Sequence, residues 1–521
     1  MNNNQTKNAP SGPGRRSGKG GFPPLGVRGL GLVIIIGSGN AALCAGISAL
    51  ENGASVLMIE KADEKEWGGN SRYTAGAMRF AYNSNEDLLP LLKNPTDEKI
   101  AITDFGSYPK EKFLADLQHF NEGEPTTELQ QFLVEESLPA LQWLASHNIK
   151  FDPIYSRQSF VKDGKYIFWG GLTLEAEGEG NGLVQEELKA FLRLGGQIKY
   201  NCAAEEIIQE NGKITGVRCS DNGVETIISC QSVVLACGGF EANKELRVKY
   251  LGEKWANAKV RGTRHNMGKG LEMATKLGAA LNGHFGGCHA TPMDKFMPEY
   301  GNLNIPHIER KHYRKISYLF GIMLNANGER FVDEGLDFRN YTYAQFGKAV
   351  LMQPDEFAWQ IFDAKVMNLL YSEYKTADAS FIEADTLEEL AQKLTGINPD
   401  AALKTIQEYN ASVNQSIPFD PTTKDGRTTE GLTLNKTNWA NVLDTPPFRA
   451  YPVTGGITFT YGGVKVNKKG QVLDQNDVPI AGLFACGEMV GGVFFYGYPG
   501  GSGLTSGTIF GRYAGQTAAA P

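Results

Sequence analysis

The stretch VIIIGSGNAALCAGISALENGASVLMIEK, residues 33–61, decides the fold of the chain. Residues 32–36 form a short apolar run before a glycine turn and predict a buried strand. Residues 42–50, rich in alanine and leucine, predict a helix. Residues 56–59 predict a second strand, which Glu60 closes. A strand, a helix and a strand in this order are typical of an α/β protein with a parallel sheet.

The turn between the first strand and the helix, Gly37-Ser38-Gly39-Asn40-Ala41-Ala42, has the G-x-G-x-x-A form of a dinucleotide site. The helix N-terminus can face a pyrophosphate, and Glu60, 23 residues after Gly37, can reach a ribose hydroxyl. Gly39 lets the backbone approach the pyrophosphate, because a Cβ would occupy that space. A turn with nothing bound is the alternative, and the complete order of elements favours a dinucleotide. NAD and FAD sites share this motif, so it does not distinguish them.

Composition narrows the class of protein. The 521 residues predict two or three domains, and 41% hydrophobic with 21% charged residues suits a soluble globular protein. The net charge of −7 gives no reason to expect nucleic acid as a partner. No apolar run reaches about 18 residues, so we expect no transmembrane segment. Residues 1–30, which are polar and rich in glycine and proline, are predicted to be disordered.

The seven cysteines are scattered and form no C-x-x-C pair. A disulfide framework, a zinc ribbon or an iron–sulfur run is therefore not expected, and the prediction for metal sites is none. A reducing, cytoplasmic setting is the simplest expectation.

The loop after Glu60, residues 68–77, exposes backbone in a run of small residues and suits a second phosphate or a flat ring. With this loop the sequence resembles the flavoprotein family of fumarate reductases, succinate dehydrogenases and 3-ketosteroid dehydrogenases. The further segments that carry the resemblance are VVLACGGFEAN (233–243), RGTRHNMGKGLEMATKLGAAL (261–281), GIMLNANGERFVDEGLDFRNYTYAQFG (321–347) and AGLFACGEMVGG (481–492). Among the branches of that family, GGNSRYTAGAMRF, GGCHATPMD and FRNYTYAQFG are most similar to tricarballylate dehydrogenases.

The resemblance implies a Rossmann-like FAD-binding domain made of two segments, 31–292 and 446–518, with an inserted α+β capping domain over 293–445. It also implies FAD as the cofactor, held non-covalently, since no histidine lies between Gly68 and Phe80, where succinate dehydrogenases attach it. The expected FAD-binding residues are Gly37, Ser38, Gly39, Asn40, Ala41, Glu60, Lys61, Gly69, Asn70, Ser71, Thr74, Gly76, Ala204, Ala236, Gly238, Gly487, Glu488, Ser502 and Leu504.

In the resembled family an arginine of the capping domain carries a proton, and its match here is Arg339. Because arginine is a poor base, the nearby Asp333, Glu334 and Asp337 could help it. Tyr498 replaces the arginine that clamps a carboxylate in fumarate reductases, and the histidine that those enzymes place before a Gly-Gly is absent.

Other cations must then bind an acidic substrate. Tyr498 and His289 join Arg339 as expected catalytic residues, and His289 is also a candidate for contact with a carboxylate. Arg261, Arg264 and His265 are the expected substrate-binding residues, because a bidentate arginine suits a carboxylate. A surface charge or a structural histidine is the alternative at each of these positions.

The leading functional hypothesis is an FAD-dependent dehydrogenase that acts on a carbon–carbon bond next to a carboxylate, similar to the oxidation of tricarballylate to cis-aconitate. A ketosteroid-dehydrogenase-like or ene-reductase-like enzyme with a less charged enone substrate is the second hypothesis, which Tyr498 favours. A third is an electron-carrying flavoprotein without its own substrate. The sequence has one dinucleotide fingerprint, so a quinone, a redox protein or oxygen is expected to exchange electrons with the flavin.

Overall fold

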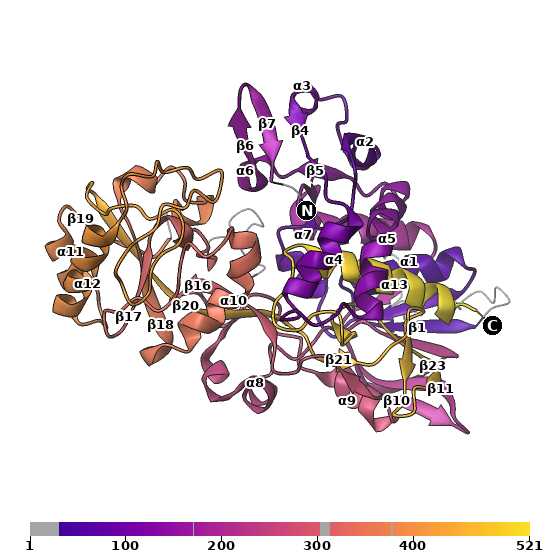
Figure 1. Cartoon of the computed structure of the whole chain (residues 1–521). Helices are drawn as coiled ribbons and strands as arrows, with labels where there is room; N and C mark the ends of the chain where they lie inside the picture. Colours follow the sequence, from indigo (N-terminus) through magenta and orange to yellow (C-terminus); the bar gives the residue numbers. More distant parts are fainter. Residues whose placement is uncertain (1–30, 170, 303–312, 377–378, 521) are drawn as a thin grey trace, which may run out of the picture.

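The computed structural model describes residues 31–169, 171–302, 313–376 and 379–520. The tail expected to be disordered, residues 1–30, lies outside the described residues. Figure 1 shows a larger lobe around strand β1 (Leu32–Ile36) and a smaller lobe around strand β18 (Phe357–Phe362). Helices and sheets are present in both lobes, which confirms the predicted mixed α/β fold.

A six-stranded sheet forms the centre of the larger lobe. Its strands follow the order β22-β23-β13-β1-β2-β9, and all neighbouring pairs except β22–β23 are parallel. The strands beside β1 are β2 (Ser55–Ile59), β9 (Gln197–Lys199), β13 (Ser232–Leu235), β22 (Gln471–Leu473) and β23 (Pro479–Ala485). Two of these strands come from the C-terminal part of the chain, so segments more than 200 residues apart share one sheet.

The fingerprint helix α1 (Asn40–Glu51) follows β1 directly and begins two residues before the predicted start. It packs between α7 (Glu179–Arg193) and α13 (Ser502–Ala518). At Gly46 a Cβ would lie 2.6 Å from the ring of Phe191 on α7 and 3.4 Å from Ile35 of the sheet. The glycine therefore makes room chiefly for the neighbouring helix, not only for the sheet.

Helix α13 approaches α1 so closely that backbone meets backbone. Gly507, Gly511 and Gly515, spaced four residues apart, form one face of α13. A Cβ at Gly511 would lie 2.5 Å from the Ala41 carbonyl oxygen, and a Cβ at Gly515 would lie 2.1 Å from that of Ala45. Only glycine permits this separation, so the last helix of the chain is fixed against the first.

The smaller lobe is built on a second sheet with the order β14-β20-β18-β17. Its further strands are β14 (Lys259–Val260), β16 (Cys288–Asp294), β17 (Ile322–Asn325), β19 (Ile382–Ala384) and β20 (Phe448–Thr460). Strands β16 and β19 both pair with β20. The sheet thus takes strands from both sides of the expected boundaries at 293 and 445, and the exact division into domains stays a prediction.

Helices α11 (Leu387–Lys393) and α12 (Pro399–Ser412) cover this sheet. Thr386 and Asn398 cap their N-termini through side-chain oxygens, and Pro399 occupies the first turn of α12. Leu390, Ala391 and Leu394 are buried. Helix α10 (Arg339–Leu351) packs on β16 and β20 and begins at the junction of the two lobes.

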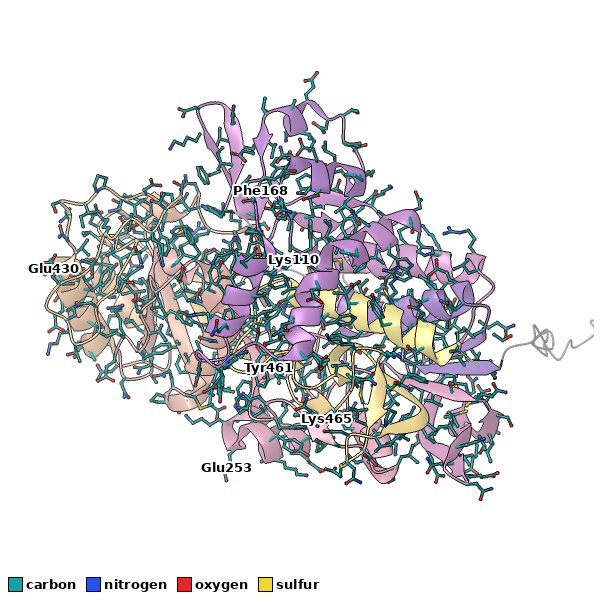
Figure 2. The ribbon with its side chains drawn as sticks, turned by 45° about the vertical axis from the view of Figure 1, so that its right-hand side comes forward. Lys110, Phe168, Glu253, Glu430, Tyr461 and Lys465 are labelled. Atoms are coloured by element: carbon teal, nitrogen blue, oxygen red, sulfur yellow. The ribbon has the colours of Figure 1, made fainter. Side chains whose placement is uncertain are left out.

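The larger lobe carries an extension that reaches the smaller one. It includes the hairpin β6 (Ser159–Lys162) and β7 (Lys165–Phe168), at the top of Figure 1. Figure 2 labels Phe168 at the base of this hairpin and Glu430 on the outer side of the smaller lobe. Hydrogen bonds join the lobes here: Gln158 and Asn340 exchange amide hydrogen bonds of 3.2 and 2.9 Å, and the Trp169 indole donates to the Thr422 carbonyl at 2.7 Å.

The remaining elements of the larger lobe surround its central sheet. They include β3 (Ala77–Met78), β4 (Thr103–Asp104), β5 (Phe151–Pro153), β8 (Leu174–Ala176), β10 (Cys202–Glu210), β11 (Lys213–Asp221), β12 (Val224–Ser229), β15 (Leu281–Asn282), β21 (Gly463–Val464), α2 (Asn85–Leu88), α3 (Glu98–Ala101), α4 (Lys110–His119), α5 (Glu128–Ser146), α6 (Tyr155–Gln158), α8 (Lys244–Leu251) and α9 (Lys269–Lys276). Over the residues that the structure describes, no helix is both long and apolar enough to cross a bilayer.

Replacing Gly515 by alanine should lower the free energy of unfolding by about 1–3 kcal/mol, the usual cost of overpacking. The added Cβ would meet the backbone of Ala45, which cannot move aside without displacing α1. Urea unfolding followed by circular dichroism measures the change. Gly503→Ala on the same helix is the matched control, because its Cβ would have no neighbour within 3.7 Å. Equal stability of the two variants would contradict the close contact of the helices.

Candidate functional site

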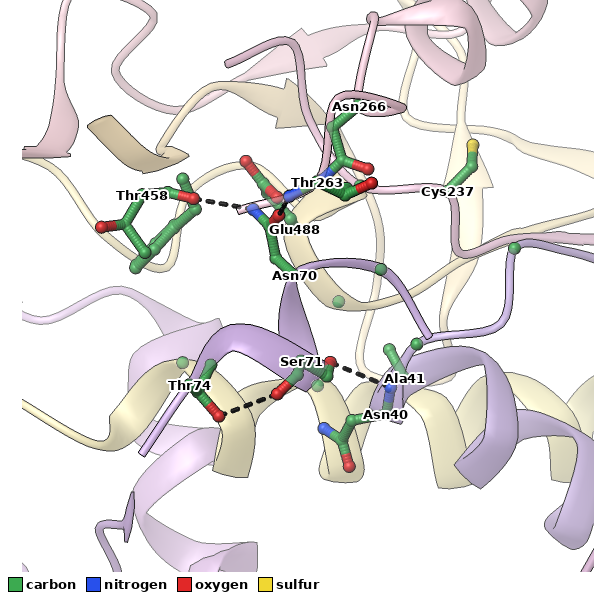
Figure 3. A pocket seen from close by; sticks show the side chains of 18 of the residues that line it. Asn40, Ala41, Asn70, Ser71, Thr74, Cys237, Thr263, Asn266, Thr458 and Glu488 are labelled. Atoms are coloured by element: carbon green, nitrogen blue, oxygen red, sulfur yellow. Dashed lines mark hydrogen bonds between the residues drawn. The ribbon is translucent and has the colours of Figure 1, made fainter. Parts of the chain in front are cut away.

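One elongated cavity runs from the glycine turn of the larger lobe to the base of α10 in the smaller lobe. Its volume of about 540 Å³ is in the range of about 300–1,000 Å³ that is usual for cofactor and ligand sites. Figure 3 shows its middle part, where Asn70, Thr458 and Glu488 come together from three separate segments. Both lobes therefore contribute to one site.

The glycine turn forms one end of the cavity. Gly37 has φ of +111°, its N–H donates to the Ile59 carbonyl at 2.9 Å, and a Cβ there would lie 2.4 Å from the Ala236 oxygen. Gly39 is the N-cap of α1 and offers no side-chain acceptor, and the first turn of α1 has no acidic residue. The positive end of the helix dipole is thus free to bind an anion, as a pyrophosphate requires.

Glu60 lies at the end of β2 and lines the same end of the cavity. Its carboxylate accepts hydrogen bonds from the Ser38 hydroxyl and from the Ala62 N–H, the latter at 2.7 Å. Burial raises the pKa of Glu60, and the bond from Ser38 opposes that shift. Ser38 also accepts from the Gly68 N–H at 2.9 Å, so the acid, the glycine turn and the next loop are held as one unit.

Most of the expected FAD-binding residues line this cavity. Those on its wall are Gly37, Ser38, Gly39, Asn40, Ala41, Glu60, Lys61, Gly69, Asn70, Ser71, Thr74, Ala204, Ala236, Gly238, Gly487, Glu488 and Leu504. Gly76 and Ser502 do not lie on the wall. Gly76, with φ of +67°, packs on the backbone of Glu179, and the Ser502 hydroxyl donates to the Pro499 carbonyl.

Asn70 connects the segments around the middle of the cavity. Its Nδ2 donates to Glu241 Oε1 at 2.6 Å and to the Thr458 carbonyl at 2.7 Å, and its Oδ1 accepts from the Thr263 N–H at 2.8 Å. The loop after Glu60 is therefore joined both to strand β20 and to the segment after β14.

Three arginines lie on the wall at the other end: Arg261, Arg314 and Arg339. Burial and the charge of Arg314 lower the pKa of Arg261 to about 10, so Arg261 remains a cation at neutral pH. Arg314 is paired with the buried Glu373. Arg339 is the first residue of α10, and its guanidinium stacks on the Tyr371 ring at 4.0 Å.

Aromatic side chains complete this end of the cavity. The hydroxyls of Tyr343, on α10, and Tyr498 are 2.8 Å apart, and both residues line the wall beside Phe459 and Phe494. Burial raises the pKa of Tyr343, and the charges of Arg261 and other arginines oppose the shift. Two hydroxyls beside several cations can bind and polarise a carbonyl or carboxylate oxygen.

His289 does not line the cavity, which differs from our expectation of a catalytic contact. Its ring packs edge-on behind Tyr343 and Tyr498, with ring centroids 5.0 and 4.9 Å away. Burial and the charges of Arg261 and Arg314 lower the pKa of His289 well below its ordinary value. The histidine is neutral at physiological pH and cannot supply a positive charge to a carboxylate.

Arg264 and His265 also lie away from the arginine-rich end of the cavity, where we expect the substrate to bind. Arg264 forms a bidentate pair with Glu66, 2.7 Å at its closest, and does not line the cavity. His265 bonds to the same Glu66 at 2.8 Å and lies near Glu60, at the glycine-turn end. Of the three cations expected to bind substrate, only Arg261 lies at the arginine-rich end.

The acidic side chains of Asp333, Glu334 and Asp337 form contacts within the smaller lobe. Glu334 is paired with Arg330, Asp333 accepts from Thr437, and Asp337 accepts from Lys424. The expected help of these acids to Arg339 stays a prediction.

Sequence reasoning missed several residues on or near the wall. Arg314 follows a segment without a motif, and Tyr371 lies outside the quoted segments. Tyr343 and Glu241, by contrast, lie within the quoted segments 321–347 and 233–243, and an acid beside a glycine turn was a signal that could have been used.

Residues 33–504 match the family model described as FAD binding domain. A probable fumarate reductase of Shewanella frigidimarina is 28% identical over 94% of this chain and 74% of its own length. An NADH:fumarate oxidoreductase of Klebsiella pneumoniae is also 28% identical over 94% of this chain, which spans only 47% of that relative. The structure of a flavocytochrome c3 fumarate reductase in an open conformation superposes with a TM-score of 0.70, at 25% identity, over 94% of this chain and 78% of that one.

Glu60→Leu should abolish FAD binding while the fold persists, because the ribose would lose its acceptor and Ser38 its partner. Absorbance of the purified protein measures bound flavin, and circular dichroism reports the fold. Glu64→Leu, at an exposed position four residues later, is the control that should purify yellow. Full FAD occupancy in Glu60→Leu would contradict the assigned role.

Proposed function

This chain belongs to the FAD-binding-domain family and is an FAD-dependent oxidoreductase of carbon–carbon bonds; we propose that its substrate is a polycarboxylate. Tricarballylate, oxidised to cis-aconitate, is the specific substrate that we propose, because the segments GGNSRYTAGAMRF, GGCHATPMD and FRNYTYAQFG resemble that branch of the family. The relatives described above are named for fumarate, a substrate of the same chemical class.

The gathering of Arg261, Arg314 and Arg339 at one end of the cavity carries this proposal. Arg261 and Arg314 are close enough for the charge of one to lower the pKa of the other. Two adjacent cations in a buried site are costly unless anions neutralise them, and Arg314 pairs with Glu373. A substrate with more than one carboxylate would supply further negative charges.

Arg339 is the residue that we propose to hold and move the proton. When bound, FAD supplies the hydride chemistry. Arg339 stands at the start of α10, beside Tyr371 and four residues before Tyr343, so one helix turn sets both a guanidinium and a hydroxyl on the cavity wall. The Tyr343–Tyr498 hydroxyl pair would orient a substrate oxygen, and the aromatic rings around it exclude water from the reacting carbon.

A less charged enone is the second candidate substrate. The observation that favours it is the aromatic lining by Phe459, Phe494, Tyr343 and Tyr498, together with the close pair of hydroxyls. Such a surface could hold a flat apolar ring system and polarise its carbonyl. The three arginines favour the acid instead.

Electrons must also pass between the bound flavin and a second substrate. We propose an external partner, which is a quinone, a redox protein or oxygen, because the sequence has a single dinucleotide fingerprint at residues 37–42. FAD is proposed to be held non-covalently, so denaturation and filtration should release all of it from the protein.

Arg339→Gln should lower turnover by about 10²–10⁴-fold, the usual contribution of general acid–base catalysis. FAD and substrate should still bind, because glutamine, although shorter and uncharged, stays polar and Arg261 and Arg314 remain at that end of the cavity. Steady-state kinetics and anaerobic flavin reduction measure the loss. Arg339→Lys, which keeps a positive charge, should retain more activity than Arg339→Gln. Wild-type rates in Arg339→Gln would require another proton carrier, and Tyr498 and Tyr341 would be examined next.

Tricarballylate should bleach the flavin under anaerobic conditions, in a panel with dicarboxylates and 3-ketosteroids. Arg261→Ala should raise KM by about tenfold or more, a factor that corresponds to about 1.4 kcal/mol. Arg264→Ala is the matched control and should leave KM unchanged, because Arg264 is exposed and pairs with Glu66. Bleaching by a neutral ketosteroid, without a response to any polycarboxylate, would overturn the proposal in favour of the enone.

A further inference from the structure

The first turn of α10, which begins with Arg339, has little local support of its own. Phe338 precedes it as the N-cap residue and makes no side-chain capping bond, and the turn contains no acidic residue. The first N–H groups of a helix have no intrahelical acceptor, so an end without a cap frays unless other contacts hold it. Contacts with other elements therefore decide where the Arg339 side chain lies.

Asn340, the residue after Arg339, is bound by the extension of the larger lobe. Gln158 Nε2 donates to Asn340 Oδ1 at 3.2 Å, and Asn340 Nδ2 donates to Gln158 Oε1 at 2.9 Å. Gln158 is 5% exposed, and both residues line the cavity together with Arg339. Because hydrogen bonds are directional, two reciprocal bonds between planar amides fix both the distance and the orientation of the start of α10.

The backbone of the extension fixes Gln158 in turn. Its N–H donates to the carbonyl of the buried Ile154 at 3.0 Å, and its carbonyl accepts from the Trp169 N–H at 3.3 Å. The Trp169 ring also packs on Phe338, with ring centroids 5.7 Å apart. The residues on both sides of Arg339 in sequence are therefore in contact with the extension.

Tyr341, two residues after Arg339, is bound by a second segment of the larger lobe. Its hydroxyl donates to Oδ2 of Asp116, on α4, at 3.2 Å. Burial raises the pKa of Tyr341, so the hydroxyl keeps the proton that it donates. Asp116 is buried and also accepts from the Tyr108 hydroxyl at 2.5 Å and from the Lys112 ammonium at 2.6 Å. Several donors thus hold this carboxylate, which makes it a fixed acceptor for the hydroxyl of Tyr341.

We propose that Gln158 and Asp116 are positioning residues for Arg339: by holding Asn340 and Tyr341 they place the guanidinium on the cavity wall. Asp116 does not line the cavity, and the amide of Gln158 is uncharged and carries no proton to a substrate. The inference rests on the proposed role of Arg339 in proton transfer. A catalytic group misplaced by about 1 Å can cost about 10²-fold in rate, so such support has a measurable effect.

Q158A should lower kcat by up to about 10²-fold. KM should change little, because Arg261 and Arg314 stay at that end of the cavity. Y155F is the matched control and should keep the wild-type kcat, since the Tyr155 hydroxyl bonds at 2.9 Å to Thr103 within the extension. Steady-state kinetics of the holoenzymes measures both constants. A raised KM with unchanged kcat in Q158A would make Gln158 a substrate contact and overturn the proposal.

Tyr341 and Tyr108 offer a second matched pair, because both hydroxyls donate to the same oxygen of Asp116. Y341F should lower kcat more than Y108F, whose lost bond lies within the larger lobe. In an R339Q background, Q158A and Y341F should cause little further loss, because the group that they position is gone. Loss by the same factor in the R339Q background as in wild type would contradict the positioning of Arg339.

Hydrogen–deuterium exchange of the resting holoenzyme tests the contact without turnover. The backbone amides of residues 341–345 should exchange faster in Q158A than in wild type, because the start of α10 opens more often, and Y155F should match wild type. Unchanged exchange in Q158A would overturn this inference. Wild-type turnover in R339Q would instead overturn the proposed role of Arg339, so the two failures are distinguishable.

Discussion

Contact between the backbones of α1 and α13 holds the cavity in shape. Gly511 and Gly515 permit the approach, and a Cβ at either position would fall within 2.5 Å of a carbonyl oxygen of α1. The contact lets Asn40 donate to the Leu504 carbonyl at 2.9 Å and accept from the Thr508 hydroxyl at 3.1 Å. The residue that starts the fingerprint helix is thus fixed by the last helix, and both line one cavity. The cofactor site forms only when the chain's two ends have packed together.

The two ends of the cavity carry acidic and basic side chains, respectively, and neighbouring residues hold these side chains in place. Glu60 stands at the glycine-turn end, where its hydrogen bond to Ser38 joins it to the turn that faces the pyrophosphate. At the other end Arg261 follows β14 and Arg339 begins α10, and both elements belong to the smaller lobe. The arginines therefore belong to one lobe and the glycine turn to the other, so the cavity joins the two lobes.

The sequence alone was sufficient to predict the part of the site whose elements follow one another directly along the chain. The strand, turn, helix, strand and acid of residues 32–60 follow one another in the structure as predicted, because each element is fixed by neighbours in sequence. The resemblance to flavoproteins also placed Arg339 on the cavity wall. The contacts of Arg264 and His265 could not be predicted from their motif, because both residues bond to Glu66, which lies about 200 residues earlier.

Long-range contacts also explain why the chemistry of His289 could not be read from its motif. A histidine in a glycine-rich segment resembles an exposed ligand, yet β16 pairs with β20 and places it under Tyr343 and Tyr498. Arg261 then lies close enough to suppress protonation of the ring. The positive charge for an acidic substrate must come from groups that stay charged when buried, and arginine meets this condition where histidine does not.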